Sequence, residues 1–577
     1  MSSYQSVFPA AERSAWDALV KKIMNGALPD SLDRRDEDGL LIKALYDITD
    51  DEAGVFGALP AGPNAANRSL YGWDITQPIN AAHKGERTAI TASNEHILTA
   101  LRSGANSLSL FIDEESADHL DALLDGVILD AVDIQLCPVN TCGRGGGNIA
   151  AKFDQFVAAT NAPSSPVARL NVNAGLDPLA GVASTDATIA AGLALVNGDH
   201  CFRGIFNLDG WVWHNRGLTA AAEIGVILAG LAAIMRYADA DNMDMNKVAQ
   251  SIVASVALPA DSFAGLVKLR ALRLGWAGLC AALGLDDTPL YIAGMASLRM
   301  VSTLDADVNM LRNTTALLGG AMGGADRLGA FGHDAVNGES DAARRLTRMT
   351  QVMMVEESGL GRAVDPAAGA PFIEQRSDDL AVAGWMVMQE IEAKGGLATA
   401  LADGMISDLA KHAADQRDAA LSAGHSPMVG VSLQPVSGEQ INQTLSFGTF
   451  MDSDIYGGLR RPATIIEALR QSSRPLRILI ILPDHGDDGG RATMTSKREE
   501  RALRDWLAIA GLQAVTLHNP SDDDIAAAAP DIMIFGTGSN GDGARGFGTA
   551  RQMQAETILG CDDQIGLLGQ ILEGEAA

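Results

Sequence analysis

Two histidines stand in the stretches of this sequence that are best suited to chemistry. His485 follows an apolar run of strand length in "ILIILPDHGDDGG" (residues 478–490), which also holds three aspartates and three glycines. His214 lies in "GWVWHNRG" (210–217), after two tryptophans that flank a valine. A histidine at the end of a parallel strand can ligate a cofactor metal or donate a hydrogen bond to a substrate carbonyl. Both stretches are therefore candidate sites, and the surrounding elements decide whether they lie at a ligand-binding edge.

The elements on both sides of His214 predict a barrel. Short β-like runs recur between Ala- and Leu-rich stretches, at residues 107–113, 126–136, 168–174, 202–210 and 290–297. Near-continuous apolar strands that alternate with helices are typical of a parallel sheet covered on both faces. At least five such units before residue 300 predict an α/β protein with a (β/α)8 TIM barrel.

Two helices are predicted in the second half of the barrel region. Residues 377–396 have Ser377 as a candidate N-cap, and Gly395 is expected to end the helix. Residues 315–326 hold four glycines, which permit close packing against neighbouring elements. A phosphate cradle is the alternative interpretation, but no G-x-G-x-x-G or Walker pattern is present, so packing is favoured.

The C-terminal part differs from the rest. A polar, loop-like segment at about 434–474 precedes a final piece of about 100 residues that reads strand, helix, strand, helix, strand and then two more helical segments. The three strands are expected at 476–482, 512–517 and 531–539, fewer than the five of a complete flavodoxin-like domain. The loops at His485 and at 536–543 would lie at the carboxyl edge of this sheet, where such folds bind ligands.

Composition excludes several classes of protein. The 577 residues are 47% hydrophobic, and 72 Asp plus Glu against 43 Lys plus Arg give a formal net charge of −29. This field repels phosphate backbones and anionic lipid, so we expect no nucleic-acid and no membrane partner. The N-terminal residues lack the pattern of a secretory signal, which favours the cytoplasm. Five scattered cysteines do not describe a disulfide framework, and the close pair Cys137 and Cys142 is interpreted as a plain loop, not as a metal site.

Four stretches together resemble the methylmalonyl-CoA mutase family. They are "EESGLGRAVDPAAGAPFIEQRSDDLAVAGWMVMQEIEAKGG" (356–396), "FAGLVKLRALRLGWAGL" (263–279), "VNMLRNTTALLGGAMGGAD" (308–326) and "SPMVGVS" (426–432). The resemblance runs in family order from about residue 70 to the C terminus. It implies an N-terminal arm (1–45), a barrel of the acyl-CoA mutase type threaded by the CoA tail (46–433), a linker (434–474) and a degenerate flavodoxin-like, cobalamin-type domain (475–577). The activity implied is adenosylcobalamin-dependent interconversion of methylmalonyl-CoA and succinyl-CoA, an intramolecular transfer.

The family's cobalamin motif is altered here. Catalytic chains carry D-x-H-x-x-G, whereas in this sequence Asp484 is adjacent to His485 and Asp488 stands where the glycine is expected. The aspartate spacing that would orient the imidazole is lost. His485 is therefore interpreted as a relic.

The substrate motifs are altered as well. In place of T-x-R-Q-Y-A-G-F the sequence has "YGWDITQPIN" (71–80), with Asp74 and Pro78 and no arginine to bind phosphate. Trp213 occupies the tyrosine position of the family's G-Y-H-M-Q-E-A-G. Where the family has a polar H-S-Q-T-S run, the sequence has Gly294, Met295 and Ala296.

These changes predict the small, non-catalytic subunit of a heterodimeric mutase. No catalytic, cofactor-binding or metal-binding residue is assigned, and adenosylcobalamin is expected on the partner large subunit. One alternative is a divergent acyl-CoA mutase with its own substrate site, in which His214 would be catalytic. The other is a non-catalytic scaffold.

Overall fold

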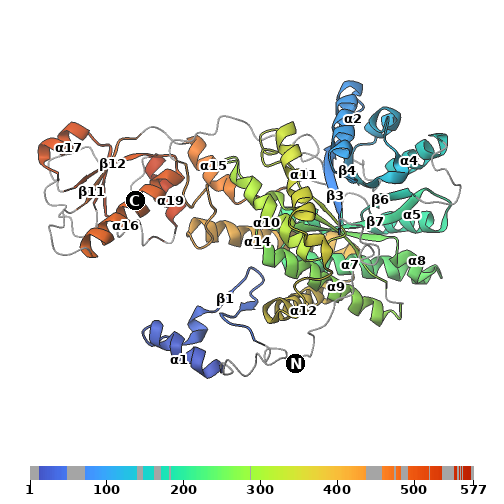
Figure 1. Cartoon of the computed structure of the whole chain (residues 1–577), viewed down its shortest axis with the longest axis horizontal. Coiled ribbons are helices and arrows are strands. Elements are labelled where there is room, and N and C mark those ends of the chain that lie inside the picture. The colour runs from blue at the N-terminus through green and yellow to red at the C-terminus, as the bar shows by residue number, and fades with distance from the viewer. Residues whose placement is uncertain are drawn as a thin grey trace.

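The computed structural model describes residues 12–47, 72–139, 147–160, 170–180, 184–285, 288–436, 458–472, 476–482, 491–518, 520–535, 551–554, 558, 561 and 563–573. In Figure 1 a helix-covered barrel occupies the right of the view, a smaller C-terminal sheet lies at the left, and the N-terminal arm lies below.

The largest unit is a closed barrel of eight parallel strands in the order β10-β3-β4-β5-β6-β7-β8-β9. The strands are β3 (Asp74–Asn80), β4 (Ser107–Ile112), β5 (Asp133–Pro138), β6 (Leu170–Leu176), β7 (Phe202–Asp209), β8 (Ile252–Leu258), β9 (Tyr291–Ala296) and β10 (Arg327–Gly329). Most of their residues are buried, as a sheet covered on both faces requires. The predicted (β/α)8 barrel is therefore confirmed.

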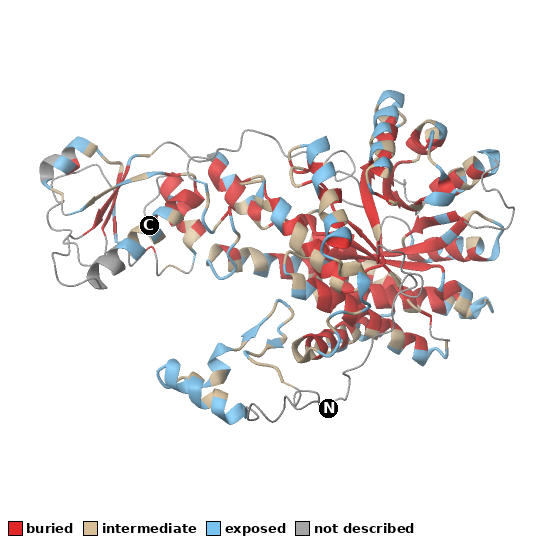
Figure 2. Cartoon of the chain, in the orientation of Figure 1, coloured by how far each residue is buried: buried red, intermediate tan, exposed pale blue. Residues whose placement is uncertain are grey.

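Helices cover the outside of the barrel, and buried residues concentrate where they meet the strands (Figure 2). The longer ones are α2 (Arg87–Arg102), α4 (Gly147–Thr160), α5 (Thr185–Asn197), α7 (Ala220–Ala240), α9 (Ser262–Ala282), α10 (Val308–Met322), α11 (Asp341–Glu356), α12 (Pro371–Ala393) and α14 (Met405–Ser422). Helix α7 is the one described helix long and apolar enough to cross a membrane, but 78% of the qualifying window is buried. It is a core helix, between the barrel and α12.

The glycines of α10 serve packing, as predicted. A Cβ at Gly319 would lie 2.6 Å from the backbone oxygen of Ser262, and one at Gly320 would lie 2.5 Å from a methyl group of Leu328. These distances are too short for any larger residue without movement of the neighbour. Helix α10 can therefore approach α9 and β10 closely.

Several predictions about individual elements are wrong. Helix α12 begins at Pro371, so Ser377 is not an N-cap but lies inside the helix and donates to the Ile373 carbonyl at 2.7 Å. A strand was expected at 126–136, but residues 129–131 form a short helical turn and β5 begins only at Asp133. Leu129 and Val132 are buried, although they lie outside the strand. The stretch 434–474, expected to be loop-like, contains the helix α15 (Ala463–Ser472), whose buried apolar face packs on the C-terminal core.

The C-terminal sheet has four described strands, all parallel, in the order β12-β11-β13-β14. They are β11 (Ile478–Leu482), β12 (Ala514–His518), β13 (Ile532–Phe535) and β14 (Arg551–Gln554), with helices α16 (Arg491–Ile509), α17 (Asp522–Ala528) and α19 (Gln564–Glu573). The order agrees with the start of a flavodoxin-like sheet. The expected count of three strands is wrong, because β14 is a fourth, short and largely polar strand in the part where only helical segments were expected.

The N-terminal arm consists of α1 (Arg13–Ile23) and a two-stranded hairpin, β1 (Arg34–Arg35) and β2 (Leu41–Ile42). Helix α1 buries none of its residues. The acidic turn of the hairpin holds the arm on the barrel: Asp36 pairs with Arg376, and Glu37 accepts from Arg417 at 2.9 Å. Besides these polar pairs, the Tyr46 ring lies 5.3 Å from the Phe372 ring between centroids, and Leu40 packs against the barrel core.

Candidate functional site

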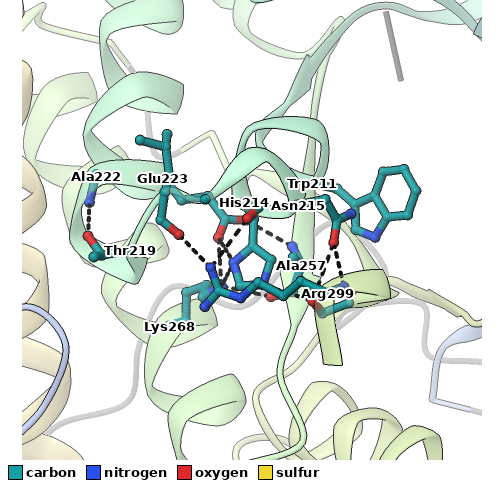
Figure 3. A network of polar contacts seen from close by, with 12 residues as sticks. Trp211, His214, Asn215, Thr219, Ala222, Glu223, Ala257, Lys268 and Arg299 are labelled. Carbon is teal, nitrogen blue, oxygen red and sulfur yellow. Dashed lines mark hydrogen bonds and ion pairs between the residues drawn. The ribbon is translucent and has the colours of Figure 1, made fainter. Parts of the chain in front are cut away.

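The C-terminal mouth of the barrel is the place to look for a site, since TIM-barrel enzymes bind their substrates there. His214 comes from this end, on the short helix α6 (Gly210–Arg216) that directly follows β7. Asp209 caps α6 by accepting from the Val212 amide at 3.2 Å. Figure 3 shows His214 among Glu223, Lys268 and Arg299, with the Trp211 ring pointing away from this group.

Both ring nitrogens of His214 already have partners. Nδ1 lies 3.1 Å from a carboxylate oxygen of Glu223, and Nε2 lies 3.0 Å from the Ser297 hydroxyl. Lys268 donates to the same Glu223 oxygen at 2.6 Å and to the Ala257 carbonyl at 2.8 Å. His214 is 1% exposed and Glu223 is fully buried. The histidine is therefore a bonded member of a buried network, with no nitrogen directed at an open site.

The electrostatics of this network favour a neutral imidazole. Burial lowers the pKa of His214 well below its usual value, and the charges of Arg299 and Lys268 lower it further. Burial raises the pKa of Glu223, and the Lys268 ammonium opposes that rise. With Nδ1–H donated to the carboxylate, Nε2 accepts from Ser297. This imidazole holds the network together.

Three aromatic rings close the mouth beside His214. Phe111 lies 5.7 Å from Phe331 and 6.4 Å from Trp211 between ring centroids, and the Trp211 indole donates to the Ala296 carbonyl at 3.0 Å. All three rings are more than 90% buried, and Met295 packs in the same apolar cluster. Rings in this arrangement exclude water and fill space.

Below the rings, polar side chains fill the barrel axis. Arg327 donates to Asp133 at 2.8 Å and also to Gln135, and Thr76 donates to Ser107 at 3.0 Å. The cavity left between this layer and the rings has a volume of about 20 Å³. That is room for about one water molecule, so the axis is a packed core and not a channel.

A carboxyl pair lies beside the mouth. The Asp209 amide donates to Asp177 at 3.4 Å, and both residues follow or end neighbouring strands, β6 and β7. Burial raises the pKa of Asp209 to about 7, and burial together with Asp209 raises the pKa of Asp177 well above its usual value. Arg216, over the Trp213 ring at 4.8 Å, partly offsets the two negative charges.

The other predicted positions lie apart from one another. Asp74 begins β3 at the opposite end of the barrel, where it accepts from Asn106 at 2.7 Å and burial raises its pKa to about 6. Gly294 and Met295 do reach the mouth on β9, and Met295 fills space there. His485 and Cys142 lie outside the described residues. Within the described ranges there is no group of three His, Cys, Asp or Glu side chains that could hold a metal ion.

Sequence reasoning missed Glu223 and Lys268. Part of the signal was present, because Glu223 is an isolated charge in the apolar first part of α7, and Lys268 is one of three basic residues, with Arg270 and Arg273, in the otherwise apolar α9. A fully buried charge requires a partner, so two such residues predict an ion pair. What the sequence did not reveal is that His214 is the third member.

The retained motif residues of α9 and α12 are structural. Arg270 pairs with Asp365 and, at 2.6 Å, with Glu374, while Arg273 pairs with Asp326 at 3.1 Å. These pairs tie α9 to α12 and to the start of β10. Breaking a buried pair costs about 3–5 kcal/mol, so these motif residues contribute to the stability of the fold.

Comparison with known proteins agrees with this geometry. A family model described as methylmalonyl-CoA mutase matches residues 204–446. A "Methylmalonyl-CoA mutase small subunit" from Streptomyces virginiae is 30% identical over 461 residues, 76% of this chain and 73% of that protein. A "Probable methylmalonyl-CoA mutase small subunit" from Mycobacterium tuberculosis is 30% identical over 84% of this chain and 78% of that protein. The "Methylmalonyl-CoA mutase small subunit" from Propionibacterium freudenreichii subsp. shermanii is 26% identical over 85% of this chain and 79% of that protein. The chain belongs to the methylmalonyl-CoA mutase family.

Proposed function

We propose that this chain is the non-catalytic small subunit of an adenosylcobalamin-dependent methylmalonyl-CoA mutase. A large catalytic subunit would bind both the acyl-CoA and the cofactor. The observation that carries the proposal is the filled barrel axis, with about 20 Å³ left beneath three buried rings. A mutase whose CoA tail passes through its barrel needs an open axis.

The described residues of the mouth do not fit the reacting groups of a mutase. Substrate thioester and carboxylate need donors that are free before binding. The two nitrogens of His214 bond to Glu223 and Ser297, and the nearby Trp211 donates to a backbone carbonyl. No catalytic step is therefore assigned to this chain.

The physical role that remains is association. Helix α1 buries none of its own residues. The apolar side chains of Leu19, Ile23 and Leu28 in the arm are each more than half exposed. Apolar side chains in such an array are typical of an interface, and a partner that binds only the folded chain stabilises it by mass action. The large subunit would in turn be stabilised by this chain.

Co-expression tests the proposal. The chain alone, given adenosylcobalamin and methylmalonyl-CoA, should show no isomerisation, and co-expression with a large chain should yield an active one-to-one complex. In that complex His214→Gln should leave kcat and KM unchanged once the amount of folded complex is matched. Arg236→Gln, which removes an exposed arginine on α7, is the control.

Two results would contradict the proposal. One is turnover by the chain alone. The other is a loss of kcat in the His214→Gln complex when its stability and composition equal those of the control.

A further inference from the structure

A second cavity, at the opposite end of the barrel, carries an inference that goes beyond the proposed function. It has a volume of about 460 Å³ and is lined by residues at or near the N-terminal ends of β5 to β10. Pockets for small ligands have volumes of about 300–1,000 Å³, so this cavity is large enough for a compact molecule.

The charge of the lining is opposite to that of the whole chain. Three of its four charged residues are cationic, Arg203, Lys247 and Arg327, and the fourth is Asp133. Arg327 pairs with Asp133 at 2.8 Å, so these two charges offset one another. Two further cations in one cavity of a chain with a net charge of −29 create a local attraction for anions.

Arg203 and Lys247 have no carboxylate partner among the described residues. Arg203 is exposed and donates to the Asn171 amide oxygen at 3.1 Å, which orients the guanidinium on β6 and β7. Lys247 comes from α8 (Met245–Ala249) and is exposed, like Arg203. An arginine and a lysine whose charges are not neutralised are suited to bind a carboxylate or phosphate group.

The hydroxyl of Tyr291 is a third feature of the cavity. It is buried and has no hydrogen-bond partner within the described part of the chain, although the guanidinium of Arg327 lies 5.7 Å from the ring centroid. A buried hydroxyl without a partner costs free energy unless a ligand or water satisfies it. It stands at the start of β9 in the wall of the cavity.

The cavity does not continue to the mouth. Arg327 lines both this cavity and the 20 Å³ cavity above it, and its bonds to Asp133 and Gln135 separate the two. A long chain cannot pass this layer, whereas a compact anion fits below it.

We propose that this cavity is a binding site for a compact organic anion, with its carboxylate or phosphate group held by Arg203 and Lys247 and a polar atom bonded to the Tyr291 hydroxyl. The site is independent of assembly with a large subunit. The site lies at the end of the barrel opposite to the mouth that Phe111, Trp211 and Phe331 close, so binding there does not require the mouth to open.

Calorimetric titration of the full chain at low ionic strength tests the proposal. Glycerol 3-phosphate and malonate serve as probes, and the tighter of the two identifies the anionic group. One of them should bind with one-to-one stoichiometry. Arg203→Gln combined with Lys247→Gln should weaken binding by about tenfold or more, because two charge-assisted contacts are lost. Arg236→Gln, an exposed arginine on α7 outside the cavity lining, should leave the affinity unchanged.

Tyr291→Phe separates a binding role from a structural one. The variant should fold normally, since the hydroxyl has no hydrogen-bond partner among the described residues, and should weaken binding of the probe by about three- to tenfold. The proposal is overturned if neither probe binds, or if the double variant binds as well as the control. It is also overturned if coenzyme A displaces the probe and binds more tightly, because the cavity would then be the entrance of a substrate path.

Discussion

Replacing Lys268 should destabilise the barrel strongly through the charge that it leaves behind. In Lys268→Met the stem of the side chain is kept and the ammonium is lost, so the change in packing volume is small. Lys268 is 1% exposed and donates to Glu223 at 2.6 Å. Its removal leaves a fully buried carboxylate with the Ala257 amide, at 2.8 Å, and His214 as its remaining described partners. Removing one partner of a buried ion pair lowers the free energy of unfolding by about 3–5 kcal/mol, because the other charge stays buried without its partner.

The loss should depend on pH in a defined direction. Burial already raises the pKa of Glu223, and Lys268 opposes that rise, so the variant raises it further. A carboxyl group with a raised folded-state pKa binds a proton more readily when folded. The loss of folding stability caused by ionising this buried carboxyl is therefore absent at pH values below the unfolded-state pKa, and it grows as the pH rises. The deficit of Lys268→Met should be smaller at pH 5.5 than at pH 8.

Urea denaturation followed by tryptophan fluorescence at both pH values measures these effects. Glu223→Gln combined with Lys268→Met should be less destabilised than the sum of the single variants, with a coupling of about 1–3 kcal/mol. Lys411→Met, at a side chain that is 69% exposed, should stay within about 0.5 kcal/mol of the parent. A loss below about 1 kcal/mol for Lys268→Met at pH 8, or strict additivity in the double variant, would refute the buried-pair account.

Three further changes test the mouth and the packing. Phe111→Ala should cost about 3–5 kcal/mol of unfolding free energy, measured in urea, and should open a cavity that binds small apolar probes. Gly320→Ala should cost about 1–3 kcal/mol in the same assay, because the new Cβ would lie 2.5 Å from Leu328 and 2.6 Å from Leu258. Asp209→Asn should flatten the pH dependence of stability between about pH 4 and 7: the native carboxyl, with its pKa raised to about 7, loses stability as the pH rises through that window. An unchanged slope would show that the carboxyl is not protonated in the folded chain.

Much of the fold follows from local patterns. The runs at 107–113 and 202–210 alternate apolar residues with a few polar ones. All residues of β4 and all of β7 except Arg203 are buried, as expected for a sheet that is covered on both faces. Strand β14 was not predictable in this way, because "RQMQ" has little apolar pattern and gains its structure from pairing with β13. Ser377 has the residue type of a cap, but the helix begins six residues upstream at Pro371, a residue suited to the first turn.

The sequence by itself predicts which chemistry is missing. Comparison with the family's motifs finds no arginine near Asp74 and an aspartate adjacent to His485, whereas ligation needs particular residue types at particular spacings. Only the tertiary structure decided how the mouth of the barrel is filled. Phe111, Trp211 and Phe331 come from segments far apart in the chain, and they meet because the barrel brings the ends of its strands to one mouth. Contacts between distant residues depend on strand order and register, which no local pattern encodes.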